Sequence, residues 1–331
     1  WYFWDEISSE IKTPDLEYLE MFEKKYGIKI WNIIFNERLF VKWNKYHKFE
    51  YNQILSIIEE ECKFFEKVLD ESKPDFLIIK HTDYHRNHLF LEICGARGIK
   101  VLMLMPSLLG RNSIIVNEKL KIYENHKERK TLLDELTDFS QLRNNLKEFD
   151  KYSQMKNEII SGGGNFSISK KILLTLKWIF TSSSEDFKRY DNLGMTKFNQ
   201  IKQRLLSGLQ KIKRESFINK NLEKTILDEK FVYYPLHVDP ERTITIDSPF
   251  YTNQKEVILH IARSIPSNYR LYVKEHFNQK FRNWRDIEFY KTVHDFPNVR
   301  LLHPDVDPKE IIKKCSLVMT ITGTTGFEGA L

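Results

Sequence analysis

The sequence has little cysteine and no long apolar run. Its three cysteines, Cys62, Cys94 and Cys315, lie among apolar residues without CxxC spacing. This predicts buried free thiols in a reducing compartment rather than a disulfide framework. We expect no secretory signal, and the longest apolar candidate, residues 172–180, is about half the ~20 residues that span a bilayer. We therefore expect a cytoplasmic protein.

Neither sign of charge dominates. The 52 lysines and arginines are offset by 46 aspartates and glutamates, leaving a formal net charge of +6 and a pI of about 8.9. No dense basic block with interleaved aromatic residues occurs, which argues against a dedicated nucleic-acid binder. The mild positive bias fits an anionic substrate such as a nucleotide. It also fits loose peripheral contact with an anionic membrane, at its inner face.

The composition is that of a globular protein. Hydrophobic residues make up 41% and aromatic residues 13% of 331 residues, which is long enough for two domains. The chain opens without a start methionine and stops inside an expected helix. We therefore expect a chain cut at both ends, with the last part of its C-terminal sheet missing.

The first half alternates between helical and strand patterns. Residues 51–69 carry a broad apolar face at helical spacing. Gly98 is expected to end a second long helix. The expected elements are helices at 15–26, 51–69 and 87–97, a buried strand at 76–79 and a strand at 100–105. This rhythm is typical of a Rossmann-like βαβ half.

Three histidines follow the first of these strands. His81, His85 and His88 are spaced by four and three residues, with Asp83 between them. They could bind a metal from one helix face, or form a polar loop of hydrogen-bond donors. No acidic pattern accompanies them, which favours the loop and no metal site. A catalytic base in this loop stays open, and we expect these residues on the acceptor side.

Residues 117–229 are expected to be a helical insertion and linker between an N-terminal domain (1–116) and a C-terminal domain (230–331). Gly162, Gly163 and Gly164 form a flexible break rather than a phosphate loop, since no Lys-Ser/Thr pair follows. The basic run at 211–214 is interpreted as a solvated helix face. The expected elements are helices within 132–156, at 168–180 and at 195–217, with the domain connection near 218–229.

The last hundred residues repeat the alternation, which predicts a parallel sheet. The expected elements are strands at 231–235, 270–274, 299–302 and 317–321, and helices at 253–263, 284–295, 308–314 and from Thr325 onward. Three strands run into polar residues. Because the carboxyl ends of parallel strands form the ligand crevice, these three ends predict one site.

Each strand end carries useful chemistry. Lys274 could neutralise a phosphate, with Glu275 and His276 as proton donor or acceptor and Arg282 as a second anion contact. These ionisable residues are not expected in the core. His237, Asp239 and Glu241 alternate along an extended loop, which presents a base and two carboxylates to one side. Their individual roles stay open, but we expect His237, Asp239 and His276 to be the catalytic residues, and Glu241 and Arg242 to bind the substrate or its nucleotide.

The third strand end is a Gly/Thr turn that opens a helix. Its glycines allow close backbone approach, and the helix start offers N–H groups to a phosphate, although an ordinary capped helix has the same pattern. Glu328 could bind a sugar diol or compensate the helix dipole. The expected binding residues here are Thr322, Gly323, Thr324, Thr325, Gly326 and Glu328.

Several motifs together resemble the capsule polysaccharide biosynthesis family, which includes transferases of 3-deoxy-manno-octulosonic acid (Kdo). The matching stretches are Tyr-Pro-Leu-His-Val-Asp-Pro-Glu-Arg ending at Arg242, Tyr-Thr-Asn-Gln ending at Gln254, Val-Lys-Glu-His ending at His276, and Thr-Ile-Thr-Gly-Thr-Thr-Gly-Phe-Glu ending at Glu328. The resemblance covers the last hundred residues well. Phe277 departs from the family pattern, which has proline there.

The resemblance implies a GT-B-like α/β fold: two Rossmann-like domains with parallel sheets facing a cleft. It implies donor binding by Lys274, His276, Thr324, Thr325 and Glu328, with His237 facing the cleft. The expected activity is metal-independent glycosyl transfer from a nucleotide sugar such as CMP-Kdo to a polysaccharide or glycolipid, with no cofactor. A nucleotide-sugar 2-epimerase and a non-catalytic polysaccharide-binding or export subunit are the alternatives. Sugar, nucleotide base, acceptor, stereochemistry and oligomeric state stay open.

Overall fold

The computed structural model describes residues 12–106, 113–123 and 195–330, with the single positions 1, 3, 173, 176, 177 and 180. The chain forms two compact units, residues 1–199 and 200–331. The helices expected within 132–156 and the glycine break lie outside the described residues, as does most of the helix expected at 168–180. In the described ranges, no helix is both long and apolar enough to cross a membrane.

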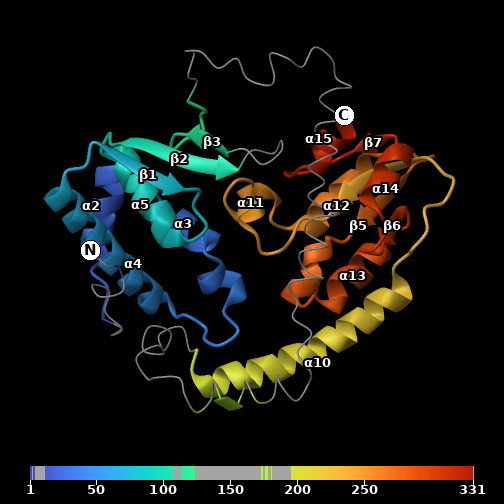
Figure 1. Ribbon diagram of the computed structural model, residues 1–331, viewed down its shortest axis with the longest axis horizontal. Helices are drawn as coiled ribbons and strands as arrows, with labels where there is room; N and C mark the ends of the chain where they lie inside the picture. The colour runs from blue at the N-terminus through green and yellow to red at the C-terminus, as the bar shows by residue number, and fades with distance from the viewer. Residues whose placement is uncertain are drawn as a thin grey trace. The chain divides into compact units, whose positions relative to one another are not determined.

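The first unit is a small sheet with helices packed on it (Figure 1). Asp15 caps the first helix by accepting a hydrogen bond from the Tyr18 N–H, and Gly27 ends it at a φ of +67°. The predicted helices and strands of this half are confirmed. The elements are α2 (Leu16–Tyr26), α3 (Ile30–Asn36), the π-helix η1 (Leu39–Trp43), α4 (Tyr51–Ser72), β1 (Phe76–Lys80), α5 (His85–Ala96), β2 (Lys100–Pro106) and β3 (Ser113–Val116).

The sheet of this unit has the order β1-β2-β3. β1 and β2 are parallel, with Phe76 opposite Lys100, whereas β3 runs antiparallel to β2. The expectation of a wholly parallel sheet is therefore wrong here. β1 is also not a fully buried strand: Leu77 and Ile79 pack on the core, while Phe76 and Ile78 are exposed. Side chains alternate along a strand, and in the described residues the helices bury one face.

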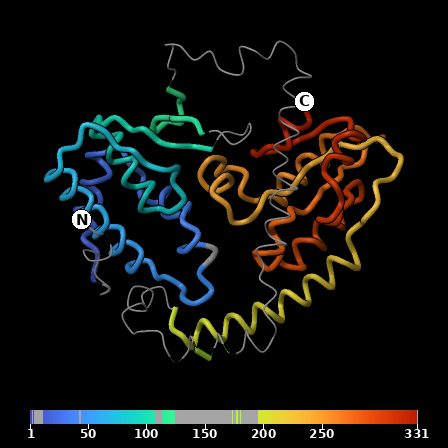
Figure 2. The backbone as a smooth tube through the Cα atoms, viewed as in Figure 1, coloured from blue at the N-terminus to red at the C-terminus, as the bar shows by residue number. Residues whose placement is uncertain are grey.

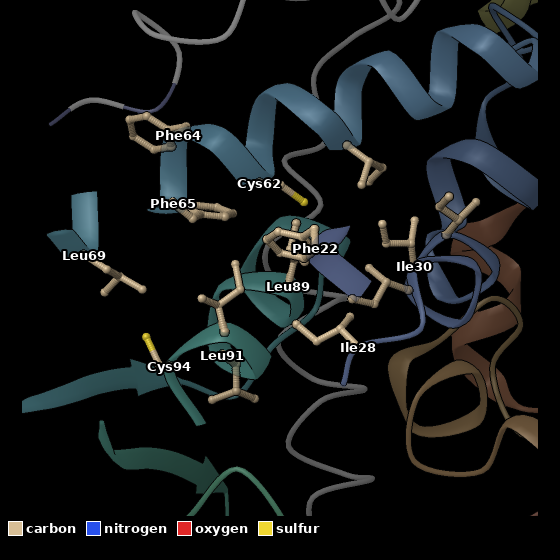
Figure 3. Close-up of a cluster of buried hydrophobic side chains, with 14 of the residues drawn as sticks. Phe22, Ile28, Ile30, Cys62, Phe64, Phe65, Leu69, Leu89, Leu91 and Cys94 are labelled. Atoms are coloured by element: carbon tan, nitrogen blue, oxygen red, sulfur yellow. The ribbon is translucent and has the colours of Figure 1, made fainter. Parts of the chain in front are cut away.

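The core of the first unit lies between that face and the helices (Figure 3). α4 supplies Cys62 and Phe65, and α5 supplies Leu89 and Cys94. Both thiols are fully buried and free, as predicted. Burial raises the pKa of both thiols, so they remain protonated and serve as small apolar groups.

The second unit alternates strand and helix (orange to red in Figure 2). Its long first helix is α10 (Lys197–Asn221), of which residues 200–221 belong to this unit. The remaining elements are β4 (Phe231–Pro235), α11 (Arg242–Thr245), the 3-10 helix η2 (Pro249–Tyr251), α12 (Gln254–Ser264), β5 (Arg270–Lys274), the 3-10 helix η3 (Phe277–Arg282), α13 (Ile287–His294), β6 (Val299–Leu302), α14 (Pro308–Lys314), β7 (Leu317–Val318) and α15 (Thr325–Ala330).

The four strands form a parallel sheet in the order β6-β5-β4-β7. Val232 and Tyr234 pack on one face with α12 and α13, and Phe231 and Tyr233 pack on the other with Ile311 of α14. Both faces are covered, which explains why β4 is an unbroken apolar run. The predicted parallel sheet of the second half is confirmed.

Two predicted elements are shorter than expected. The last strand stops at Val318 instead of residue 321, because the chain turns at Thr320, whose hydroxyl donates to the Thr322 carbonyl at 2.6 Å. The helix expected at 284–295 begins at Ile287. Asn283 and Trp284 have φ values of +63° and +59°, which a right-handed helix excludes.

Candidate ligand site at the carboxyl edge of the second sheet

The strand order of the second unit locates a site. From β4 the chain adds β5 and then β6 on one side of β4, and it returns to add β7 on the other side. The switch point of the sheet therefore lies between β4 and β7. Ligands of open α/β sheets bind outside the carboxyl ends of the strands at this switch point. The residues after β4 and β7 are therefore the first to consider. They are the stretches that the sequence singled out at His237 and at Thr322.

His237 joins these two strand ends. Its Nε2 lies 2.5 Å from the carbonyl oxygen of Thr322, 3.1 Å from the Thr322 amide nitrogen and 3.2 Å from the Thr320 hydroxyl. The Thr322 carbonyl oxygen can only accept and the Thr322 N–H can only donate, so Nε2 bonds the carbonyl in the tautomer that protonates Nε2 and the N–H in the other tautomer. Burial, together with the charge of Arg285, lowers the pKa of His237 although the Thr322 contact raises it. At neutral pH the ring is therefore neutral.

Two buried side chains fix the backbone of His237. Gln254, the first residue of α12, accepts from the His237 N–H at 2.8 Å and donates to its carbonyl at 3.1 Å. The same carbonyl accepts a hydrogen bond from Arg285. The loop position of the imidazole is thus set by α12 and by the segment before α13.

Arg285 is the centre of this network, and the sequence analysis missed it. Its guanidinium is buried, donates to Glu275 at 2.9 Å and lies 3.6 Å from Asp239. It also lies over the Phe289 ring, 4.9 Å from the centroid. Arg285 therefore ties the ends of β4 and β5 together. No local pattern distinguishes it from a surface arginine; only its tertiary partners do.

The expectation that the ionisable residues after β5 lie outside the core is wrong for two of them. Lys274 is 5% exposed and Glu275 is completely buried. Glu275 accepts hydrogen bonds from Arg285, from the Tyr290 hydroxyl at 2.7 Å and from the His276 N–H at 2.6 Å. Its carboxylate is thus saturated by protein donors, which is the arrangement of a structural residue.

His276 is the most perturbed imidazole of this edge. Burial lowers its pKa to about 4, with further contributions from the charges of Lys274, His237 and Arg285. Its Nδ1 accepts from the Asn278 N–H at 3.1 Å. The neutral ring therefore carries its proton on Nε2 and can donate it in a hydrogen bond.

The loop after His237 is held by its neighbours. Gln279 exchanges two hydrogen bonds of 3.1 Å with the backbone of Asp239, and Arg282 donates to the Pro240 carbonyl at 3.3 Å. Arg242 is buried and paired with Asp247 at 2.5 Å, and Glu241 is the N-terminal cap position of α11. Arg242 and Arg282 thus contact the protein itself. Asp239 keeps a part-exposed carboxylate, 30% accessible.

The Gly/Thr turn has the expected backbone. Gly323 has a φ of +100°, which only glycine adopts readily, and α15 begins at Thr325 as predicted. Thr324 and Gly326 lie part-buried beside it, while Glu328 is exposed on α15. Among the described residues, Nδ1 of His237 and Oγ1 of Thr322 are buried without a hydrogen-bond partner. Buried polar atoms are nearly always paired, so these two atoms can bond a water molecule or a polar group of a ligand.

The first unit contains a separate buried charge cluster around His85. Nδ1 of His85 lies 2.6 Å from Glu37 and Nε2 lies 2.9 Å from Glu61. Burial opposes the charged ring, but the charge of Glu61 and the hydrogen bonds to Glu37 and Glu61 raise the pKa of His85 to about 10. His85 is therefore an imidazolium with both N–H groups used.

This cluster corrects the interpretation of the three histidines. Acidic partners do accompany His85, but they come from Glu37 after α3 and Glu61 of α4, far away in sequence. α5 begins at His85, so His85 and His88 lie on its first turn and only residues 81–84 form a loop. An imidazolium has no lone pair for a metal. Asp83 pairs with Arg38 at 3.8 Å, and the His81 N–H donates to the Leu104 carbonyl.

One of three comparisons with known proteins relates part of this chain to a described family. An α/β unit with a Rossmann-type strand order and a basic, histidine-rich edge defines a broad class of ligand-binding domain. Residues 174–331 match the family described as capsule polysaccharide biosynthesis protein.

The other comparisons are weaker. A search of curated proteins gives no match. A solved structure described as a S. aureus MnaA-UDP co-structure aligns at 14% identity over 82% of this chain, with a TM-score of 0.23. This chain spans 59% of that structure's length.

Proposed function

We propose that this chain is a glycosyltransferase of capsule or surface polysaccharide synthesis that binds a nucleotide-activated sugar at the carboxyl edge of β4, β5 and β7. The observation that carries the proposal is the His237–Thr322 contact at the switch point, where buried polar atoms lack protein partners. The family of residues 174–331 supports the polysaccharide context. CMP-Kdo is one donor compatible with this family.

The charges around the site suit a nucleotide phosphate. Lys274 and the neutral, part-buried His276 bring one positive charge and an N–H donor to this sheet edge, while the charge of Arg285 is offset by Glu275 and Asp239. A phosphate oxygen would be stabilised by these donors in a low-dielectric surrounding. His276, neutral at pH 7, would donate from Nε2 to a phosphate oxygen as the nucleotide leaves. The backbone around Gly323 would offer further N–H groups.

The proton of the acceptor hydroxyl needs a base. His237 fits that role poorly, because Nε2 is engaged by Thr322 and Nδ1 is buried. Asp239 has a part-exposed carboxylate at the same edge and takes the role in this proposal. The acceptor oxygen would then attack the anomeric carbon, the bond from that carbon to the phosphate oxygen would break, and Asp239 would receive the proton.

A thermal-shift panel of CMP, UMP, CDP, UDP and GDP tests donor binding. A nucleotide at about 100 times its Kd stabilises the folded state by about 2.7 kcal/mol, a shift of several degrees. We expect one base to produce this shift, unchanged by EDTA. Lys274→Ala should weaken that binding by about tenfold or more, whereas the matched Lys291→Ala, on the exposed side of α13, should not.

The outcomes separate the alternatives. No shift with any nucleotide would contradict the proposal and favour a non-catalytic polysaccharide-binding role. If the enzyme converts a nucleotide sugar to its epimer without any acceptor, the activity is 2-epimerisation and not glycosyl transfer. Nucleotide release that depends on an added glycan acceptor supports transfer.

A further inference from the structure

The helix α10 is attached to the second unit by one side of its C-terminal part. Ile218 is buried in the core, and Phe217 packs near Tyr290 with ring centroids 6.4 Å apart. Arg214 donates to the carbonyl oxygen of Asn283 at 2.9 Å and pairs with Asp286. These contacts fix which side of the helix faces the unit.

The other side carries an apolar stripe. Leu205, Leu209 and Ile212 are 67%, 67% and 69% exposed. Spacings of four and three residues align them along one face of a helix. Leu209 and Ile218 are about two and a half turns apart, so the stripe points away from the core. Large apolar side chains aligned in this way mark an interaction surface rather than scattered exposure.

The charge of the chain is concentrated on the same helix. α10 contains seven lysines and arginines and one acidic residue, Glu215. Removing these from the 52 basic and 46 acidic residues leaves 45 of each sign in the rest of the chain. The formal net charge of +6 therefore lies entirely on α10, which points to an anionic partner.

The exposed lysines lie beside the stripe. Lys202, Lys213 and Lys220 are exposed and separated by eleven and seven residues, about three and two helical turns. They form a row along one edge of the apolar stripe. Lysine stems can lie along an apolar surface while their ammonium groups reach phosphates above it. An apolar stripe edged by lysines is the pattern of a helix lying in a lipid interface.

We propose that α10 binds the surface of an anionic membrane, with Leu205, Leu209 and Ile212 inserted at the acyl boundary and the lysine row on lipid phosphates. The helix lies in the plane of the surface. Since the stripe faces away from the unit, binding leaves the core contacts of Ile218 and Arg214 intact. The inference does not depend on the proposed transferase activity.

Vesicle co-sedimentation of the full chain tests this proposal. We expect binding to vesicles of phosphatidylcholine mixed with phosphatidylglycerol, weak binding to phosphatidylcholine alone, and loss of binding at high salt. The variants Leu205→Gln/Leu209→Gln/Ile212→Gln and Lys202→Glu/Lys213→Glu should each bind about tenfold more weakly or worse. The charge control, Lys313→Glu/Lys314→Glu on exposed positions of α14, should bind within about twofold of wild type.

Three results would overturn the proposal. The first is the absence of binding to anionic vesicles by the wild-type chain. The second is equal binding to anionic vesicles by the wild type and by both α10 variants, when the melting temperatures of these variants match that of the wild type. The third is a wild-type oligomer, seen by analytical ultracentrifugation, that the glutamine variant converts to monomer, since the stripe would then be covered by a second copy.

Discussion

At the scale of single residues, Arg285 links the two loops on which the site depends. A planar guanidinium can bond Glu275 and the His237 carbonyl at once and still lie near Asp239. A lysine at this position keeps the charge but has one ammonium group at the end of a flexible stem. It cannot hold all three partners in the same geometry.

Arg285→Lys should therefore lower the free energy of unfolding by about 1–3 kcal/mol, because a buried acceptor loses its donor. The matched control is Arg300→Lys. Arg300 also bridges two glutamates, Glu223 and Glu229, but all three are part-exposed, so its loss should stay below about 1 kcal/mol. Urea unfolding measures both. Equal losses in the two variants would show that Arg285 is only another ion-pairing residue.

The same variant has a readout at the site itself. If Arg285 positions His237, the nucleotide identified in the thermal-shift panel should bind Arg285→Lys more weakly and Arg300→Lys normally. Unchanged affinity in Arg285→Lys would mean that the network stabilises the unit without shaping the site.

At the scale of elements, His85 joins three helical segments of the first unit. Glu37 follows α3, Glu61 lies on α4, and His85 begins α5. Glu37 further accepts from the backbone N–H groups of Leu39 and His85, at 2.9 and 2.8 Å. Without the imidazolium, two buried carboxylates would face each other with no cation between them.

His85→Leu should therefore destabilise the first unit by about 3–5 kcal/mol, the usual cost of removing one partner from a buried ion pair. The triple variant Glu37→Gln/Glu61→Gln/His85→Gln removes all three charges and should recover part of that loss. Urea denaturation of both proteins is the measurement. A triple variant less stable than His85→Leu would contradict the electrostatic explanation.

At the scale of the whole molecule, the two units respond to pH in opposite directions. The folded pKa of His85, about 10, lies above the ordinary value of 6.5, so its contribution is complete below pH 6.5 and is lost as the pH rises toward 10. The folded pKa of His276, about 4, lies below 6.5, so its contribution is present above pH 6.5 and is lost as the pH falls toward 4. The lowered pKa values of His237 and His303 act in the same direction as His276.

We therefore expect the first unit to weaken between pH 7 and 9.5 and the second between pH 6 and 4.5, each by at most about 1.4 kcal/mol per pH unit for each group. Peroxide oxidation in increasing urea can follow both units, with Met103 reporting the first and Met319 the second. In His276→Gln, the urea concentration at which Met319 becomes oxidised should depend less on pH between 6 and 4.5. The corresponding value for Met103 should stay unchanged. Parallel pH profiles for the two methionines would refute this assignment.

The sequence by itself determined most of the elements and which strand ends meet at the candidate site. The periodicity of apolar residues predicts the helices and strands, because the spacing of these residues depends on whether an element buries one face or both faces. The alternation of strand and helix in the last hundred residues predicts a parallel sheet, and that sheet brings His237 to Thr322 as strand ends should. The motif order also predicts the family whose model matches residues 174–331.

Only the tertiary structure decided the state of the charged side chains. Glu275 and Arg242 look like exposed ligand-binding groups in the sequence, yet each is satisfied by a protein partner. His85 becomes an imidazolium because Glu37 and Glu61 converge on it from positions 48 and 24 residues away. A local sequence pattern gives only the spacing of residues along the chain. Desolvation and charge pairing depend on the neighbours of a side chain in space, and these neighbours determine its burial, its pKa and its role.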